Sequence, residues 1–307
     1  MFVGIDVSKH HLDVHIRPAG LSFTVPRDTG GLDRLIEQLA AAGPSLIMLE
    51  ATGGFEITVA AALAAAQLPL AVVNPAQVRA FARACGKHAK TDRLDAELIA
   101  LFAERVRPEP RPVPDERARQ LSELVVRRRQ LVEMITMEGN RRQQARHPKI
   151  LRGLEKTLAT LRAALAELDQ DIDALIRRTP AWRNAENLLL SVPGIGPITA
   201  RSLIAELPEL GHLPRRRLAA LVGLAPLNRD SGQSRGPRAI AGGRTSVRNV
   251  LFMATLTAVR WDPAVRPIYM RLRTQGRPAK VALIAAARKL LTILNAILRN
   301  QQKWQSP

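Results

Sequence analysis

The chain has 307 residues, and 46% of them are hydrophobic, which suffices for the cores of two globular units and a connector. No uncharged apolar run reaches the roughly 18 residues that a membrane span needs, and no secretion signal is visible, so we expect neither a membrane protein nor an exported one. The only cysteine, Cys85, excludes an internal disulfide and a multi-cysteine metal site, and it fits a reducing cytoplasm.

The formal net charge is +19, and nearly all of the excess lies in the last third of the chain. Residues 213–307 contain eighteen Lys and Arg residues against only Asp230 and Asp262. Internal ion pairs cannot neutralise so many cations, so this segment needs an external polyanion. Arginine greatly outnumbers lysine and suits bidentate contact with phosphate, which favours nucleic acid over an anionic membrane surface.

Residues 1–110 alternate strand-like and helix-like patterns. Three strands in succession, followed by strand–helix alternation, are typical of an α/β ribonuclease-H-like (RuvC-like) domain, although the pattern alone also permits other α/β sheets. Strands are predicted at 3–7, 12–16, 21–25, 46–50 and 70–73, and helices at 31–42, 55–66, 75–84 and 91–106.

A connector is predicted over residues 111–183, where a proline-rich linker leads into a helical coiled coil. Its apolar residues alternate spacings of three and four, which is a heptad pattern. The partner helix is either the weaker apolar helix around 121–135, folded back at His147–Pro148, or the same segment of another protomer. The second arrangement would give a homo-oligomer, a dimer or tetramer. The heptad residues are Leu151, Leu154, Leu158, Leu161, Leu165, Leu168, Ile172 and Leu175.

Residues 184–307 are predicted to form a mainly α-helical domain. Gly194 and Gly196 lie in a short turn between two apolar helical stretches, which is the pattern of a helix-hairpin-helix. Glycines in such a turn allow backbone N–H groups to approach a DNA phosphate. A plain glycine turn between packed helices is the alternative.

Four acidic residues have an unusual context. Asp6 lies in an apolar strand and Glu50 ends another, so each carboxylate must be solvated, hydrogen-bonded or bound to a cation. Asp92 and Asp95 lie three residues apart at the start of a helix, and therefore on one face. Together the four could bind hard cations that support phosphoryl chemistry, although each alone could be a helix cap or a surface group. Asp13 has no comparable context.

Short motifs follow one another along the whole chain. They are GIDVSK at 4–9, LEATG at 49–53, NP at 74–75, KTDRLDA at 90–96, VPGIG at 192–196, GLAP at 223–226, RDSG at 229–232, GGR at 242–244 and VRNVL at 247–251. Their order resembles that of a bacterial transposase family, the insertion-sequence one-hundred-ten family with its eleven-eleven branch, to which the Piv-type DNA invertases are related.

The resemblance implies site residues and partners. Asp6, Glu50, Asp92 and Asp95 would bind Mg²⁺ or Mn²⁺, and Ser231 would attack the DNA phosphodiester and become covalently linked to it. The partners would be donor and target DNA together with a non-coding guide RNA encoded by the element. The protein would act in the bacterial cytoplasm, on the nucleoid.

The residues themselves support part of this role for Ser231. Cations near it could neutralise a phosphate, but no neighbouring histidine offers a base, so the metal site would have to activate the hydroxyl. Without the resemblance, Ser231 could not be preferred over Ser234 or Ser246, and a turn serine beside Gly232 would be the simpler interpretation. The arginines expected to bind nucleic acid are Arg229, Arg235, Arg238, Arg244 and Arg248.

Three functions are therefore open. The favoured one is an RNA-guided DNA recombinase that uses a serine with metal assistance. The second is a metal-dependent nuclease or junction resolvase in which water attacks. The third is a non-enzymatic helix-hairpin-helix nucleic-acid-binding protein. Because the chain has few aromatic residues on which bases could stack, we expect arginine contacts to backbones in all three cases.

Overall fold

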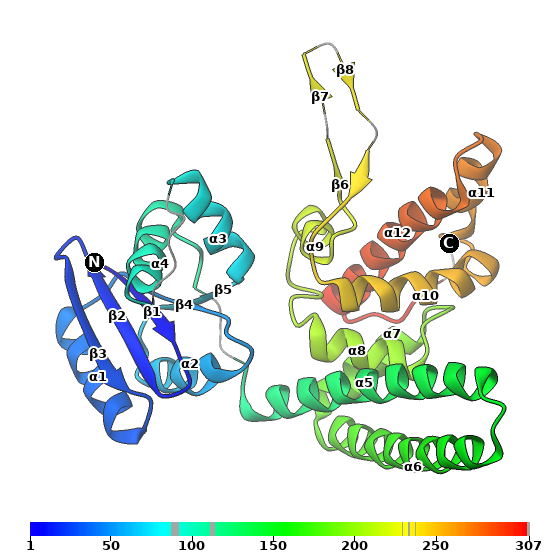
Figure 1. Cartoon of the computed structure of the whole chain (residues 1–307). Coiled ribbons are helices and arrows are strands. Elements are labelled where there is room, and N and C mark those ends of the chain that lie inside the picture. The colour runs from blue at the N-terminus through cyan, green and yellow to red at the C-terminus, as the bar shows by residue number, and fades with distance from the viewer. Residues whose placement is uncertain (87–91, 111–113, 229, 233, 237, 306–307) are drawn as a thin grey trace. The chain divides into compact units, whose positions relative to one another are not determined.

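The structure is a computed structural model that describes residues 1–86, 92–110, 114–228, 230–232, 234–236 and 238–305 (Figure 1). For residues 92–94, 234 and 235 it describes the backbone alone. The chain divides into two compact units, residues 1–115 and 116–307. We describe each unit by itself.

The first unit contains a five-stranded mixed sheet in the order β3-β2-β1-β4-β5 (Figure 1). Strands β1 (Phe2–Val7), β2 (His11–Arg17) and β3 (Leu21–Pro26) form an antiparallel meander. Strands β4 (Leu46–Glu50) and β5 (Leu70–Val73) extend the sheet in parallel on the other side of β1. All five strands lie where the apolar segments predicted them.

Helices cover both faces of this sheet, and each face has its own apolar cluster. Helices α1 (Thr29–Ala42) and α2 (Phe55–Ala65) pack on the face formed by the odd-numbered residues of β1. Helices α3 (Pro75–Ala84) and α4 (Asp92–Val106) cover the opposite face. The predicted helices are confirmed. Because strand side chains alternate between faces, the even-numbered residues of β1 face the α3–α4 layer.

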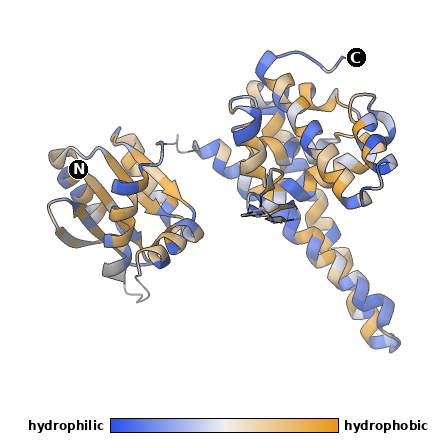
Figure 2. Ribbon diagram, turned by 90° about the horizontal axis from the view of Figure 1, so that it is seen from above, coloured by the Kyte–Doolittle hydropathy of each residue, from blue (hydrophilic) through white to orange (hydrophobic). Residues whose placement is uncertain are grey.

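The second unit begins with a helical hairpin of α5 (Glu116–Gln144) and α6 (Pro148–Arg178). Figure 2 shows this hairpin projecting from the helical body, with hydrophobic and hydrophilic residues alternating along it. The two helices pack against each other, so the heptad seam of α6 has its partner within the same chain. The fold-back at His147–Pro148 is confirmed, and the His147 side chain caps the start of α6.

The helical body is tied to this hairpin by ion pairs. Arg201 of α8 bonds Asp173 of α6 at 2.6 Å and Glu186 of α7 at 2.7 Å, and Arg129 of α5 bonds Glu206 at 2.8 Å. The hairpin and the body therefore form one unit. The helices of the body are α7 (Pro180–Leu190), α8 (Pro197–Glu206), α9 (Arg215–Val222), α10 (Thr245–Trp261), α11 (Arg266–Thr274) and α12 (Ala279–Asn300).

Helix α12 is the central helix of the body's core. It is long and apolar enough to cross a membrane by length and composition, with a mean hydropathy of 1.8. Half of that stretch is buried inside the protein, and Ala286, Leu290 and Leu294 are fully buried in the core cluster. The burial against α7, α9, α10 and α11 accounts for its apolar composition.

A narrow β-ribbon interrupts the helices between α9 and α10. Strand β6 (Pro226–Leu227) pairs with β9 (Ala239–Ile240), and β7 (Asp230–Ser231) pairs with β8 (Ser234–Arg235). Figure 1 shows this ribbon standing out from the helical body. Sequence analysis predicted a mainly α-helical domain and no strands here, because two-residue strands are too short to give a periodic pattern.

Candidate active site

Asp6 and Glu50 occupy matching positions on adjacent parallel strands. The β1–β4 register runs from Phe2 opposite Leu46 to Ile5 opposite Leu49, so the next residue on each strand is the acid. Asp6 follows Gly4 by two residues and Glu50 follows Met48 by two, and Met48 packs in the α3–α4 cluster. Both carboxylates therefore belong to the face of the sheet that α4 covers.

The direction of α4 brings its first turn to the same end of the sheet. Near the C-terminal end of α4, Glu104 accepts a hydrogen bond from Arg17 Nε at 2.8 Å, and the Arg107 guanidinium lies 5.3 Å from the centre of the Phe2 ring. Arg17 is the pairing partner of Phe2 in the sheet. The helix thus ends at the start of β1 and begins toward the end of β1.

Gly4 permits this close packing of α4 on β1. A Cβ atom at Gly4 would lie 2.3 Å from both the Ala96 carbonyl oxygen and the Ala100 nitrogen. These helix residues lie between Asp95 and Glu104, so α4 crosses β1 antiparallel, from the Asp6 end to the Phe2 end. The turn that carries Asp92 and Asp95 is therefore at the Asp6–Glu50 end of the sheet.

The structure describes the side chains of Asp6, Glu50 and Asp95 among the four predicted acids. The side chain of Asp92 lies outside the described residues. Among the side chains that are described, no three His, Cys, Asp or Glu residues form a group that could hold a metal ion. The donors have the right chemistry for Mg²⁺, since carboxylate oxygens are its preferred protein ligands. Asp6, Glu50 and Asp95 all have polar interactions.

Asp13 is a fifth acid on this face, and sequence reasoning missed it. It lies directly opposite Asp6 in the β1–β2 pairing. Thr24 Oγ1 donates to Asp13 Oδ1 at 2.6 Å, and His11 Nε2 lies 3.5 Å from Oδ2. Asp13 and Thr24 also line a cavity of about 180 Å³ beside Ala96 of α4. The short link between β1 and β2 fixes this register. The length of that link is the sequence signal from which the pairing of Asp6 with Asp13 could have been predicted.

Ser231 lies near the tip of the β-ribbon and is exposed. It pairs across the ribbon with Ser234, and Gly232 forms the turn between them with a φ of +54°. Arg238 Nη2 forms an ion pair with Asp230 Oδ2 at a distance of 3.0 Å. The ribbon thus presents a serine hydroxyl on an exposed turn that can be approached closely.

The arginines predicted to bind nucleic acid have different environments. Arg244 donates to both carboxylate oxygens of Glu209, at 2.5 and 2.7 Å, and Arg248 donates to the Gly242 carbonyl oxygen at 2.5 Å. These two therefore hold loops of the helical body together. Arg229 lies outside the described residues, as does the side chain of Arg235.

The two glycines of the α7–α8 turn also differ. Gly194 has a φ of +93°, and a Cβ there would lie 2.8 Å from the Ala258 nitrogen, so it allows the turn to pack on α10. This packing accounts for Gly194 without any ligand. Gly196 is exposed, has no neighbour within 4 Å of an added Cβ, and precedes α8 without a side-chain cap. Of these two glycines, Gly196 is the exposed one and has the space for a close approach of DNA.

Comparisons with known proteins identify the family. One family model, described as "Transposase", matches residues 3–146. A second, described as "Transposase IS116/IS110/IS902 family", matches residues 186–270, so together the two models cover most of both units. The chain belongs to the IS116/IS110/IS902 family of transposases. The sequence-based assignment to this family is confirmed.

Curated relatives of this transposase agree. It is 27% identical to the pilin gene-inverting protein of Moraxella bovis over 99% of this chain and 97% of that protein. It is 30% identical to the IS110 43.6 kDa protein of Streptomyces coelicolor over 51% of this chain and 38% of that protein. It is 34% identical to the IS900 42 kDa protein of Mycobacterium paratuberculosis over 48% and 37%, respectively.

A transposase acts on DNA, which supplies the polyanion that the charge distribution requires. Residues 213–307 carry eighteen cations, and their only acids are Asp230 and Asp262. Asp230 is paired with Arg238, and Asp262 is buried, where Oδ1 accepts from the Ala264 and Val265 nitrogens. Neither acid is therefore available to neutralise the other cations of this segment.

Proposed function

We propose that this transposase cuts and rejoins DNA through a covalent serine–DNA intermediate, with Ser231 as the nucleophile. Asp6, Glu50, Asp92 and Asp95 of a RuvC-like, ribonuclease-H-like unit would hold Mg²⁺ or Mn²⁺ for this step. The observation that carries the proposal is the antiparallel crossing of α4 on β1, which sets the first turn of α4 at the Asp6–Glu50 end of the sheet.

The support for a metal comes from the chemistry of the acids and from their position at one end of the sheet. Asp6 and Glu50 each follow a fully buried residue, Ile5 and Leu49, and both are only partly exposed. Carboxylates so placed are destabilised unless a cation or hydrogen-bond donors compensate them. When bound, the cation would polarise the phosphate and lower the pKa of a coordinated hydroxyl or water.

Ser231 would supply the attacking oxygen. Its Oγ would form a bond to phosphorus as the bond from phosphorus to one deoxyribose oxygen breaks, and the departing strand would take the proton. Attack by a second strand end would reverse these steps and rejoin the DNA. Arg238 on the ribbon and the neighbouring Arg235 would offset the charge of the phosphate. The name of the Moraxella relatives, pilin gene-inverting protein, supports DNA rearrangement as the outcome.

The test compares Ser231→Ala with Ser234→Ala, because these two residues pair in the backbone register of the ribbon. Suicide DNA substrates that trap a protein–DNA adduct should label the wild type and Ser234→Ala, but not Ser231→Ala. DNA binding should survive in all three proteins. An adduct formed equally by Ser231→Ala would exclude this nucleophile. Cleavage without any adduct would favour the metal-dependent nuclease or resolvase in which water attacks.

A guide RNA encoded by the element is the second partner that we propose. The chain has many cations and few aromatic residues for base stacking, which suits a protein that binds duplex backbones and leaves sequence choice to base pairing. Sequencing of RNA that copurifies from cells carrying the element should recover a transcript of the element. Recovery of unrelated RNA alone would contradict guidance.

A homo-oligomer is the expected assembly, and the far end of the α5–α6 hairpin is the candidate contact. The internal pairing of α5 with α6 occupies the heptad seam, yet Met137 and Ile150 near the hairpin tip are 50% and 55% exposed. Light scattering should show a dimer or tetramer that Met137→Lys and Ile150→Lys together dissociate. An unchanged mass would place the contact elsewhere.

A further inference from the structure

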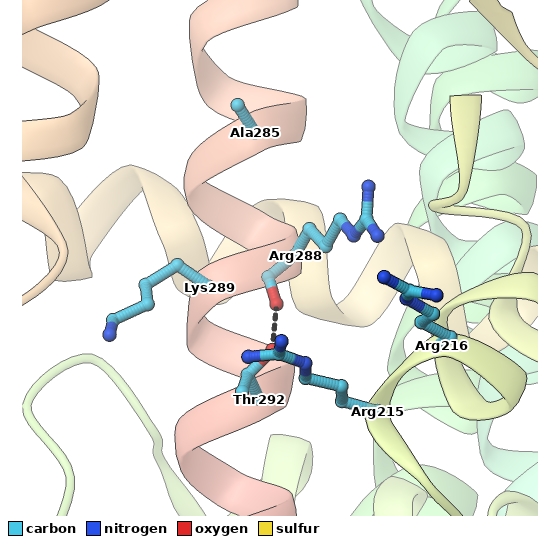
Figure 3. A pocket seen from close by; sticks show the side chains of 6 residues that line it. All are labelled: Arg215, Arg216, Ala285, Arg288, Lys289 and Thr292. Atoms are coloured by element: carbon cyan, nitrogen blue, oxygen red, sulfur yellow. Dashed lines mark hydrogen bonds between the residues drawn. The ribbon is translucent and has the colours of Figure 1, made fainter.

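A cationic pocket of about 350 Å³ lies in the second unit, between the start of α9 and the middle of α12. None of its residues belongs to the site described above. Figure 3 shows the guanidinium groups of Arg216 and Arg288 pointing toward one another, with Arg215 beside Thr292. The lining residues are Arg215, Arg216, Ala285, Arg288, Lys289 and Thr292.

The local sequence explains why this face of α12 is polar. Ala285, Arg288, Lys289 and Thr292 recur at helical spacing and share one side of the helix. The opposite side forms the core of the unit. Arg288, Lys289 and Thr292 are half-buried, so packing restricts these side chains. Thr292 Oγ1 donates to the Arg288 carbonyl oxygen at 2.9 Å, which fixes the hydroxyl on the pocket side (Figure 3).

The charge of this pocket is not balanced within the described part of the chain. Arg215, Arg216, Arg288 and Lys289 form no ion pair with any described carboxylate. Like charges that face each other without a counter-ion repel, and a bound anion relieves the repulsion. The pocket is therefore arranged for a ligand that brings negative charge.

The start of α9 adds backbone donors to this charge. Pro214 precedes the helix and makes no side-chain cap, so the first N–H groups of α9 have no capping side chain. Free N–H groups at a helix N-terminus, together with the helix dipole, favour an anion. Arg215 and Arg216 are the first two residues of that helix. The start of α9 thus adds the positive end of a helix dipole beside the charges of Arg215 and Arg216.

We propose that this pocket binds a backbone phosphate of the DNA duplex on which the transposase acts. The inference rests on the proposed function, because DNA is the substrate there. The lining has no aromatic side chain on which a base could stack and only one apolar residue, Ala285, so the ligand is recognised by charge and not by sequence. Arginine guanidinium groups suit the phosphate oxygens.

Ala285 permits a test that removes no cation. Ala285→Glu places a carboxylate in the pocket, whereas Ala285→Gln adds the same volume without charge. Anisotropy titrations of the full chain with a fluorescent DNA duplex should show weaker binding for Ala285→Glu and little change for Ala285→Gln. Equal binding by the two variants would overturn the proposal.

A second pair of variants measures the number of phosphate contacts. Arg216→Gln with Arg288→Gln should weaken DNA binding on the order of 10–100-fold at 0.1 M salt and reduce the slope of log K against log salt by about 2 units. The control, Arg152→Gln with Arg162→Gln, removes the same charge from exposed positions on α6. An equal loss of DNA affinity in the control would show that only net charge matters, and would overturn the proposal that this pocket binds a phosphate.

Two further measurements test this inference separately from the serine chemistry. Loss of affinity for an RNA duplex but not for a DNA duplex would replace DNA by RNA as the ligand and overturn the assignment. Adduct formation by the wild type at saturating DNA reports the serine chemistry separately from DNA affinity. If the wild type binds DNA through the pocket but forms no adduct, the pocket stands and the serine mechanism fails.

Discussion

Asp6 lies one residue before the end of β1 and Glu50 ends β4, in a sheet that is covered on both faces, whereas Ser231 ends a two-residue strand that is exposed on its ribbon. The acids are positioned by a core in which Ile5 and Leu49 are fully buried. The serine is positioned by two short strand pairs, and isolated ribbons of this size are marginally stable in water. Metal ligands need fixed geometry, while a nucleophile that forms a bond to DNA can be ordered by the DNA itself.

The same contrast appears in charge. Residues 1–110 contain eleven Lys and Arg residues against twelve Asp and Glu residues, whereas residues 213–307 contain eighteen against two. In the proposed function, the first region would supply carboxylates for a cation, and the second would supply cations for DNA. Chemistry and binding should therefore be separable by experiment.

The largest expected effect separates the two by removing the metal. Excess EDTA should abolish DNA cleavage and adduct formation, because the four acids would lose the cation that they hold. DNA binding, which depends on the cations of the second unit, should persist in anisotropy titrations. Added Mg²⁺ or Mn²⁺ should restore cleavage in the wild type but not in Asp6→Asn. Cleavage that continues in the chelator would contradict a metal-dependent step.

Gly4→Ala should cause the largest loss of stability. The added Cβ would lie 2.3 Å from backbone atoms of Ala96 and Ala100, so α4 must move off the sheet. We expect a loss on the order of 4 kcal/mol in urea denaturation of the first unit. Gly139→Ala is the matched control, because no atom lies within 4 Å of its added Cβ in helix α5. It should stabilise by about 0.5–1 kcal/mol. Equal effects of the two would show that α4 does not pack closely at Gly4.

These two regions also differ in what their sequences reveal. Strands and helices of the first unit follow from apolar segments bounded by turn residues, and the heptad seam of α6 follows from its spacing. The ribbon around Ser231 does not, because strands of two residues have no period. The sequence also did not decide which helix pairs with α6, since a heptad pattern identifies the apolar face of a helix but not the helix that covers it.

The face around Asp6 shows why the site was only partly predictable. Sequence analysis found Asp6 and Glu50 because a carboxylate in an apolar strand is unusual. It missed Asp13, whose strand alternates polar and apolar residues in the ordinary way. Only the pairing register sets Asp13 opposite Asp6. Likewise, nothing local in the sequence shows that Gly4 is where α4 crosses.

Asp13→Asn should weaken the response of cleavage to Mg²⁺. Asp13 faces the same layer as Asp6 and is held by Thr24, so it can add negative charge beside the proposed metal ligands without being one. We expect the Mg²⁺ concentration for half-maximal cleavage to rise by about 10–100-fold, as for partners that orient metal ligands. Asp33→Asn, an exposed change on α1 across the sheet, should leave it unaltered. An unshifted titration for Asp13→Asn would remove Asp13 from the site.

Arg244→Gln should have the larger effect on stability, and Arg238→Gln should have the larger effect on DNA binding. Arg244 bonds both oxygens of Glu209 inside the helical body, so its loss should destabilise the second unit by about 1–3 kcal/mol in thermal melts. Arg238 pairs with Asp230 on the exposed ribbon, so its loss should cost less than about 1 kcal/mol. DNA affinity of the folded proteins should fall more for Arg238→Gln. The reverse order would place Arg244 at the DNA interface.

The smallest effect concerns the Arg17–Glu104 ion pair near the C-terminal end of α4. The hydrogen bond from Arg17 lowers the pKa of Glu104 below its ordinary value of 4.5. A carboxyl with a lowered folded-state pKa stabilises the protein above its unfolded value, and that stability is lost as pH falls through the folded value. Wild type should therefore be slightly more stable than Glu104→Gln above pH 4.5, and the gap should close at lower pH. A gap that persists well below pH 4.5 would mean that Glu104 acts through packing, and the direction of α4 would then depend on Gly4 and on the Phe2–Arg107 contact alone.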